Sequence, residues 1–241
     1  MGKATVALLR DKGHRVIGVD LKDAEIVADL GSVEGRAFLI AEAARLAPDG
    51  LDGVVAGAGV AMAPDEVVLC VNYFGAVATL EGLRPLLARS RSPRAVLIAS
   101  TAAFLPYDEE VADKLLAGDQ SAISAMAEGP QGTAYATSKN AVARWLRRAA
   151  ISPEWAGAGI LLNAIGPGRV RTAMIEPILA TEEGRAALAL ATPLAVDRPY
   201  GEPQDIAEVI AFLLEVESSF LVGQVIYVDG GTDAIMRPGH V

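Results

Sequence analysis

Short apolar runs rich in valine, isoleucine and leucine alternate with longer helical patterns along this chain, and each run stops at a glycine or a polar residue. Examples are the runs at 51–59, 94–100 and 160–168. Uninterrupted apolar runs of this length are typical of strands that are buried on both faces, as in parallel sheets covered by crossover helices. The pattern predicts an α/β fold, with a doubly wound, mostly parallel sheet flanked by helices on both faces as a three-layer sandwich.

The length of 241 residues fits one α/β domain spanning 1–241, which is large enough to bury a sizeable core. No internal repeat or low-complexity linker interrupts the pattern. We expect helices at 3–12 and 33–46, and strands at 15–20, 51–59, 94–100, 160–165 and 223–231.

Composition limits the classes of function. A formal net charge of −9 and a pI near 4.8 repel the phosphates of nucleic acid, so no nucleic-acid partner is expected. No run reaches the ~18 uninterrupted apolar residues of a membrane-spanning helix, so membrane insertion is not expected either. Cys70 is the only cysteine, which excludes an intrachain disulfide and a cysteine-based metal site. This cysteine content and a start without a secretory signal predict a cytoplasmic protein.

Polar residues and glycines follow several of the expected strands. Asp20, Gly59 and Ser100 each stand where a strand ends. The carboxyl ends of parallel strands meet at one edge of the sheet, where open α/β sheets bind their ligands. These three positions therefore predict a ligand site at that edge.

A tyrosine and a lysine stand four residues apart, at Tyr135 and Lys139, within an expected helix. This spacing places both side chains on one helix face, about one turn apart. A phenol with a pKa near 10 is a poor base at neutral pH, but a nearby ammonium favours the phenolate and lowers that pKa. The pair is suited to proton transfer, although in isolation the same spacing also occurs in ordinary surface helices.

Several further landmarks occur in a fixed order along nearly the whole chain. They are Asn72 within Val71-Asn72-Tyr73-Phe74-Gly75, Ser100 at a strand end, Tyr135 with Lys139, Pro167-Gly168 followed by Val170 and Thr172, and the closing Asp229-Gly230-Gly231. Together they resemble the short-chain dehydrogenase/reductase family, which implies a Rossmann-type fold. The tail after Asp229 and an insertion at about 104–132 most resemble the hydroxysteroid dehydrogenases and carbonyl reductases of that family.

The resemblance implies hydride transfer between a nicotinamide and a carbonyl or secondary alcohol. Tyr135 would act as general acid or base, and Lys139 would lower its pKa and hydrogen-bond the nicotinamide ribose. Ser100 would hold the substrate oxygen as charge develops on it. Asn72 would support a water chain to Lys139, although an asparagine near a helix start can also simply cap backbone donors.

The resemblance also implies NAD as the cofactor. Asp20 would bind the adenosine ribose hydroxyls and repel a 2′-phosphate, which favours NAD over NADP, although it can also merely end a strand. Asp29 and Leu30 would contact the adenine, although Asp29 can equally begin the next helix. Further cofactor contacts are implied for Gly2, Ala58, Gly59, Tyr135, Lys139, Pro167, Gly168, Val170 and Thr172. For Val170 and Thr172 the plain alternative is an ordinary loop after a Pro-Gly turn, and no metal ligand is expected.

The chain departs from the family in two places. Family members begin with a strand and a glycine-rich turn that binds the pyrophosphate, whereas only Gly2 corresponds to that turn here. Loss of that strand, which lies mid-sheet in the family, would leave neighbouring strands with unpaired backbone groups. A start assigned too far downstream is the favoured interpretation, and a degenerate, cofactor-free relative is the other. The second departure is the sequence 56–59, Ala-Gly-Ala-Gly, where the family has Asn-Asn-Ala-Gly.

The segment at about 173–197 stands where family members fold a lid over the substrate, and its start is apolar. It predicts a hydrophobic, steroid-like or other ketone or secondary alcohol as substrate. Oxidation of an aryl or allylic alcohol is an alternative on the same fold, and a cofactor-free scaffold or regulatory protein is an alternative of another class. The insertion at 104–132 resembles one that shifts oligomer formation towards a homodimer.

Overall fold

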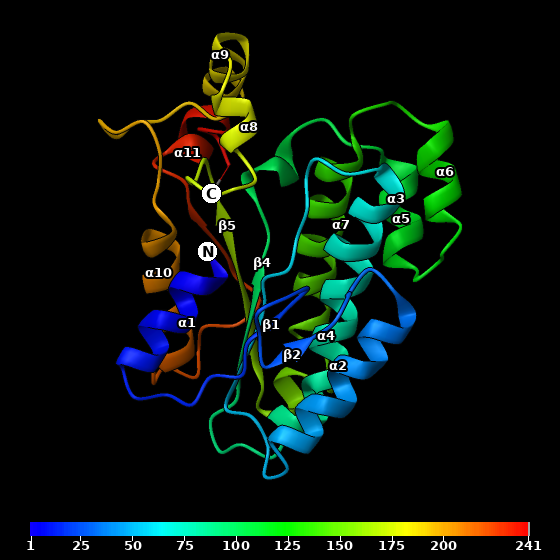
Figure 1. The fold of residues 1–241 in the computed structure, drawn as a ribbon, viewed down its shortest axis with the longest axis vertical. Helices are drawn as coiled ribbons and strands as arrows, with labels where there is room; N and C mark the ends of the chain where they lie inside the picture. The colour runs from blue at the N-terminus through cyan, green and yellow to red at the C-terminus, as the bar shows by residue number, and fades with distance from the viewer. Residues whose placement is uncertain (241) are drawn as a thin grey trace.

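Three layers make up the computed structural model, which describes residues 1–240 (Figure 1). Helices α1 and α10 cover one face of the strands, and α2, α4 and α7 cover the other. This arrangement confirms the predicted three-layer α/β sandwich.

The helices are α1 (Gly2–Asp11), α2 (Val33–Leu46), α3 (Asp65–Leu69), α4 (Ala76–Leu87), α5 (Glu109–Leu116), α6 (Ala122–Glu128), α7 (Ala134–Ala149), α8 (Glu176–Leu179), α9 (Glu182–Ala191), α10 (Pro203–Glu215) and α11 (Thr232–Met236). Three short non-α segments are the π-helix η1 (Cys70–Gly75) and the 3₁₀ helices η2 (Thr101–Phe104) and η3 (Ala156–Ala158). The strands are β1 (Val19–Asp20), β2 (Ile26–Val27), β3 (Gly53–Ala56), β4 (Arg94–Ile98), β5 (Leu161–Pro167) and β6 (Val225–Val228).

The strands form two separate parallel sheets. One has the order β3-β4-β5-β6, and the other is the pair β1-β2. The chain passes from β2 to β3 through α2, on the same face as α4 and α7. A right-handed crossover therefore places the small sheet on the side of β3 that lies away from β4. This division into two sheets matches the expectation that, without the family's first strand, the strands on either side of it have unpaired edges.

The strand predicted at 15–20 is wrong for most of its length, because only Val19 and Asp20 form a strand. The stretch 15–18 is apolar enough for a strand, but a strand also needs a neighbour to accept and donate backbone hydrogen bonds. β1 pairs only with β2, at Val19–Ile26 and Asp20–Val27. Before β1, Gly18 O still accepts from Ile26 N at 3.0 Å, but residues 15–17 join no ladder.

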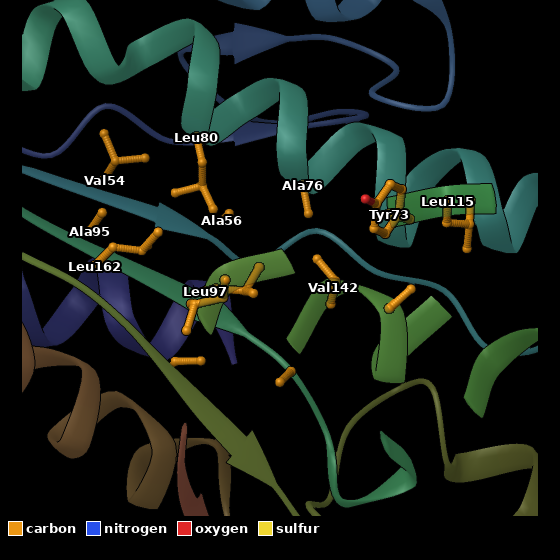
Figure 2. Packing of buried hydrophobic residues seen from close by; sticks show 14 of the residues in the cluster. Val54, Ala56, Tyr73, Ala76, Leu80, Ala95, Leu97, Leu115, Val142 and Leu162 are labelled. Atoms are coloured by element: carbon orange, nitrogen blue, oxygen red, sulfur yellow. The ribbon is translucent and has the colours of Figure 1, made fainter. Parts of the chain in front are cut away.

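Residues of β4 alternate between two hydrophobic clusters. Ala95 and Leu97 face the larger cluster, beneath α4 and α7, where Leu80 and Leu162 are also fully buried (Figure 2). Val96 and Ile98 face the smaller cluster beneath α10. Since successive side chains of a strand point to opposite faces, both faces of the main sheet are covered, as the uninterrupted apolar runs predicted.

Residues Asp65–Leu87 form one continuous helical stretch through α3, η1 and α4. By length and composition it could cross a membrane, but half of its most apolar window is buried inside the protein. We therefore assign it as a core helix. Its middle turn is the π-helix η1, a local widening that is frequent at functional sites; Asn72 lies within it.

The insertion at 104–132 folds mainly as α5 and α6, which pack on each other, and α5 also packs on α7. Val111, Ala112 and Leu115 anchor α5 in the core. The buried Thr137 hydroxyl of α7 accepts a hydrogen bond from Asp108 N at 3.0 Å. The segment expected to be a lid contains α8 and α9, neither of which has a buried residue.

Replacing Leu97 by alanine should lower the free energy of unfolding by about 2–5 kcal/mol, because it leaves a cavity at the centre of the larger cluster. Urea denaturation of the purified variant measures this change. Leu190→Ala is the matched control, since Leu190 is 84% exposed on α9. Equal losses in the two variants would contradict this description of the core.

Candidate active site

A cavity of about 120 Å³ opens at the carboxyl ends of β3, β4 and β5. It is lined by Met1, Gly57, Gly59, Ile98, Ala99, Ser100, Tyr135, Lys139, Pro167, Gly168, Val170, Thr172, Met174 and Ile175. Eight of the predicted site residues are therefore brought together from four separate parts of the chain. They are Gly59, Ser100, Tyr135, Lys139, Pro167, Gly168, Val170 and Thr172.

Tyr135 and Ser100 both line this cavity, and their side chains are hydrogen-bonded to each other. Ser100 follows β4, and its Oγ accepts a hydrogen bond from Ala102 N at 3.1 Å, which fixes the hydroxyl at the start of η2. Burial raises the pKa of the Tyr135 phenol, and a hydrogen bond with Ser100 offsets part of that rise. The phenol is consequently neutral at physiological pH and is ready to donate its proton.

Lys139 is buried one turn along α7 from Tyr135. Its Nζ donates to Ile98 O at 2.9 Å and lies 5.8 Å from the centre of the Tyr135 ring. Burial lowers the pKa of this ammonium to about 8. The pKa of the Tyr135 phenol is raised overall rather than lowered as expected, because desolvation dominates at the phenol and the Lys139 ammonium is hydrogen-bonded to the end of β4.

Asn72 does not line the cavity but lies directly behind it. Its Oδ1 accepts from Val60 N at 2.8 Å, and its Nδ2 donates to Val60 O at 2.9 Å and to Ser138 Oγ at 3.2 Å. The alternative that it caps a helix is wrong, because it lies inside a continuous helical stretch. Its side chain instead holds the loop after β3 against α7.

At two glycines of the cavity, other atoms lie so close to the backbone that a side chain would meet them. A Cβ on Gly59 would lie 3.3 Å from Asn72 Oδ1 and 3.6 Å from Lys139 Nζ. A Cβ on Gly168 would lie 2.7 Å from the Cα of Asp229. A side chain at position 168 would therefore displace the turn that follows β6.

The residues predicted to bind the adenosine lie outside this cavity. Asp20 is exposed at the end of β1, where its Oδ1 accepts from Leu21 N. Asp29 is also exposed, and the alternative that it caps the next helix is wrong because Ser32 caps α2. Leu30 is half-buried, and neither Ala58 nor Gly2 lines the cavity.

Seven residues of the site or its support are not among the predicted site residues. Six of them line the cavity, namely Met1, Gly57, Ile98, Ala99, Met174 and Ile175, and the seventh, Ser138, accepts a hydrogen bond from Asn72 Nδ2. Ser138 could have been found from its place between Tyr135 and Lys139. No local pattern marks the position of Met1, because the packing of α1 against α10 places it there.

Comparison with known proteins identifies the family of this chain. A family profile described as "Enoyl-(Acyl carrier protein) reductase" matches residues 119–233. The 3-alpha-hydroxysteroid dehydrogenase/carbonyl reductase of Comamonas testosteroni is 38% identical over 99% of this chain and 94% of its own. The chain belongs to the short-chain dehydrogenase/reductase family of oxidoreductases.

Among solved structures, the chain is similar to the 3-alpha-hydroxysteroid dehydrogenase from Pseudomonas sp. B-0831, solved in complex with NADH. That chain is 40% identical, with a TM-score of 0.91 over 100% of this chain and 95% of its own. The cis-4-hydroxycyclohexanecarboxylate dehydrogenase of Sinomonas cyclohexanicum is 29% identical over 94% of this chain and 80% of its own.

The lowered pKa of Lys139 predicts how stability depends on pH. Between about pH 8 and pH 10 the folded protein loses a proton that the unfolded chain keeps, so the free energy of unfolding should rise by about 2–3 kcal/mol. The raised pKa of Tyr135 acts against this only above about pH 10, where unfolded phenols ionise.

Chemical denaturation at several pH values measures this rise in wild type and in Lys139→Met. The variant should lack the Lys139 contribution between pH 8 and pH 10. The same slope in both proteins would show that the ammonium is not desolvated.

Proposed function

We propose that this protein is an NAD(H)-dependent oxidoreductase that interconverts a hydrophobic secondary alcohol and the corresponding ketone. The observation that carries this proposal is the convergence of Ser100, Tyr135 and Lys139 on one cavity at the carboxyl ends of the strands. A neutral buried phenol, a hydroxyl beside it and a buried ammonium are the groups that proton transfer to a carbonyl oxygen requires.

The residues present fit a nicotinamide dinucleotide. The cavity is smaller than the ~300 Å³ at which ligand pockets usually begin, so it suits one ring rather than a whole dinucleotide. Gly168 and Thr172 would hold that ring, and Asp20 would bind the adenosine ribose outside the cavity. Met1 lines the cavity and precedes α1, so the free N–H groups of that helix start lie nearby and suit a pyrophosphate.

When bound, the cofactor supplies or accepts the hydride. In reduction, Tyr135 donates its phenolic proton to the substrate oxygen, and Ser100 donates a hydrogen bond to the same oxygen. Lys139 then stabilises the phenolate that remains, because an ammonium one helix turn away favours the charged form. In oxidation the same groups act in reverse. In both directions Asn72 holds α7 and the loop after β3 together through its hydrogen bonds to Ser138 and Val60.

The apolar side of the cavity supports a hydrophobic substrate. Val170, Met174 and Ile175 line it at the start of the lid segment. A steroid-like alcohol or ketone is our first proposal, supported by the similarity to the 3-alpha-hydroxysteroid dehydrogenases of Comamonas and Pseudomonas. An aryl or allylic alcohol would fit the same chemistry and is the alternative substrate. We also propose that the protein is a homodimer and that it acts in the cytoplasm.

Replacing Tyr135 by phenylalanine should reduce kcat by about 10²–10⁴-fold, because the variant keeps the ring but has no proton to transfer. Steady-state assays with a hydroxysteroid and NAD⁺ measure this, with circular dichroism as the check on folding. Tyr73→Phe is the control, since Tyr73 is buried but does not line the cavity. Wild-type turnover in Tyr135→Phe would exclude the proposed mechanism.

Calorimetric titration should show NADH binding at least about tenfold tighter than NADPH, a difference of about 1.4 kcal/mol. The Asp20 carboxylate would repel the 2′-phosphate of NADPH, so Asp20→Asn should reduce the ratio of the NADH affinity to the NADPH affinity. Asp23→Asn should leave it unchanged, because Asp23 is exposed nearby and its positive φ suits asparagine.

The same titration separates the enzyme from the cofactor-free alternative. It is repeated on the chain extended before Met1 by a strand and a glycine-rich turn. If neither protein binds NADH while both are folded, the oxidoreductase proposal is wrong and a scaffold or regulatory role replaces it.

A further inference from the structure

The segment 229–237, here called the C-terminal clamp, contacts the cavity wall, the lid segment and η2. The first contact is with Gly168, where an added Cβ would lie only 2.7 Å from Asp229 Cα. Just before the clamp, Gly168 N donates to Val228 O of β6 at 3.1 Å. The Asp229 carboxylate accepts from Gly231 N at 2.9 Å and from Asp233 N at 2.7 Å. These bonds fix the start of the clamp against the cavity wall.

The second contact is with the end of the lid segment. Thr232 is fully buried and donates from Oγ1 to Pro193 O at 2.7 Å. Ala195 N donates to Gly230 O at 2.8 Å. Figure 1 shows α11 at the same end of the molecule as α8 and α9. The lid therefore returns to the body of the protein through the clamp.

The third contact is with η2, the turn that follows Ser100. The Arg237 guanidinium lies 4.3 Å from the centre of the Phe104 ring and 5.5 Å from that of Tyr227, and the two rings meet edge to face at 5.7 Å. Asp233 holds the guanidinium through an ion pair of 2.6 Å. The cation thus joins the last residue of η2 to β6 and to α11.

Phe104 ends the same short turn that begins at Ser100. Ala102 N and Ala103 N donate to Ser100 Oγ and Ser100 O, both at 3.1 Å, so η2 and the serine form one rigid turn. Asn140 Nδ2 of α7 donates to Ala103 O at 2.8 Å. A shift of Phe104 would therefore change the position of the Ser100 hydroxyl relative to Tyr135.

We propose that Arg237 is a positioning residue, which holds the Ser100 turn and the lid in one arrangement by binding Phe104 and Tyr227 from the C-terminal clamp. This inference rests on the proposed function, because its kinetic consequence is expressed in hydride transfer. Arg237 does not contact the reacting atoms and acts only through Phe104 and the clamp.

Kinetics of Arg237→Met, Arg237→Lys and Phe104→Leu test this role. Arg237→Met should lower kcat by about tenfold or more, since small displacements of catalytic groups are costly, while NADH affinity stays within about twofold of wild type. Arg237→Lys keeps the cation, so its kcat should decrease less than that of Arg237→Met. The Arg237→Met/Phe104→Leu double variant should be no slower than the worse single variant. Arg91→Met, at an exposed arginine in a distant loop, is the control.

Amide hydrogen exchange provides a readout that does not depend on turnover. Arg237→Met should speed exchange in both 101–105 and 193–196, and Arg91→Met should change neither. Unchanged exchange in either segment, an unchanged kcat, or additive losses in the double variant would overturn the proposal. If wild type turns over no alcohol or ketone, the proposed function fails, and exchange alone then decides whether the clamp couples the two segments.

Discussion

The central strand β4 positions most of the candidate site. It pairs with β3 on one side and with β5 on the other, and all five of its residues are buried. Its last carbonyl, Ile98 O, accepts the hydrogen bond of Lys139, and the chain leaving it carries Ser100. The paired strands β3 and β5 hold β4 at its two edges, and the two hydrophobic clusters cover its two faces. The same strand therefore fixes both Ser100 and Lys139.

Much of this arrangement is predictable from sequence, because it depends on local pattern. The buried runs define β4 and β5, and parallel strands must end at a shared edge, which brings Ser100 to Pro167 and Gly168. The spacing of Tyr135 and Lys139 places both on one face of α7. These inferences need no knowledge of which distant segments are in contact.

The remainder depends on such contacts. Residues 15–17 belong to a predicted strand but join no ladder, and their own sequence cannot reveal this. The pKa of Tyr135 follows from burial by packed elements rather than from its distance to Lys139 along the helix. Met1 lines the cavity and Arg237 reaches Phe104 only because the layers fold against each other.

Helices α8 and α9, which we propose form a lid, bury none of their residues, and Leu190 projects almost entirely into solvent. Apart from the clamp, little apolar surface fixes them, so an apolar ligand beneath the lid would supply the hydrophobic contacts that these helices lack. Part of the binding free energy would then be used to order the lid. Such a protein would accept substrates of several shapes, and their affinities would follow apolar area more closely than the pattern of polar groups.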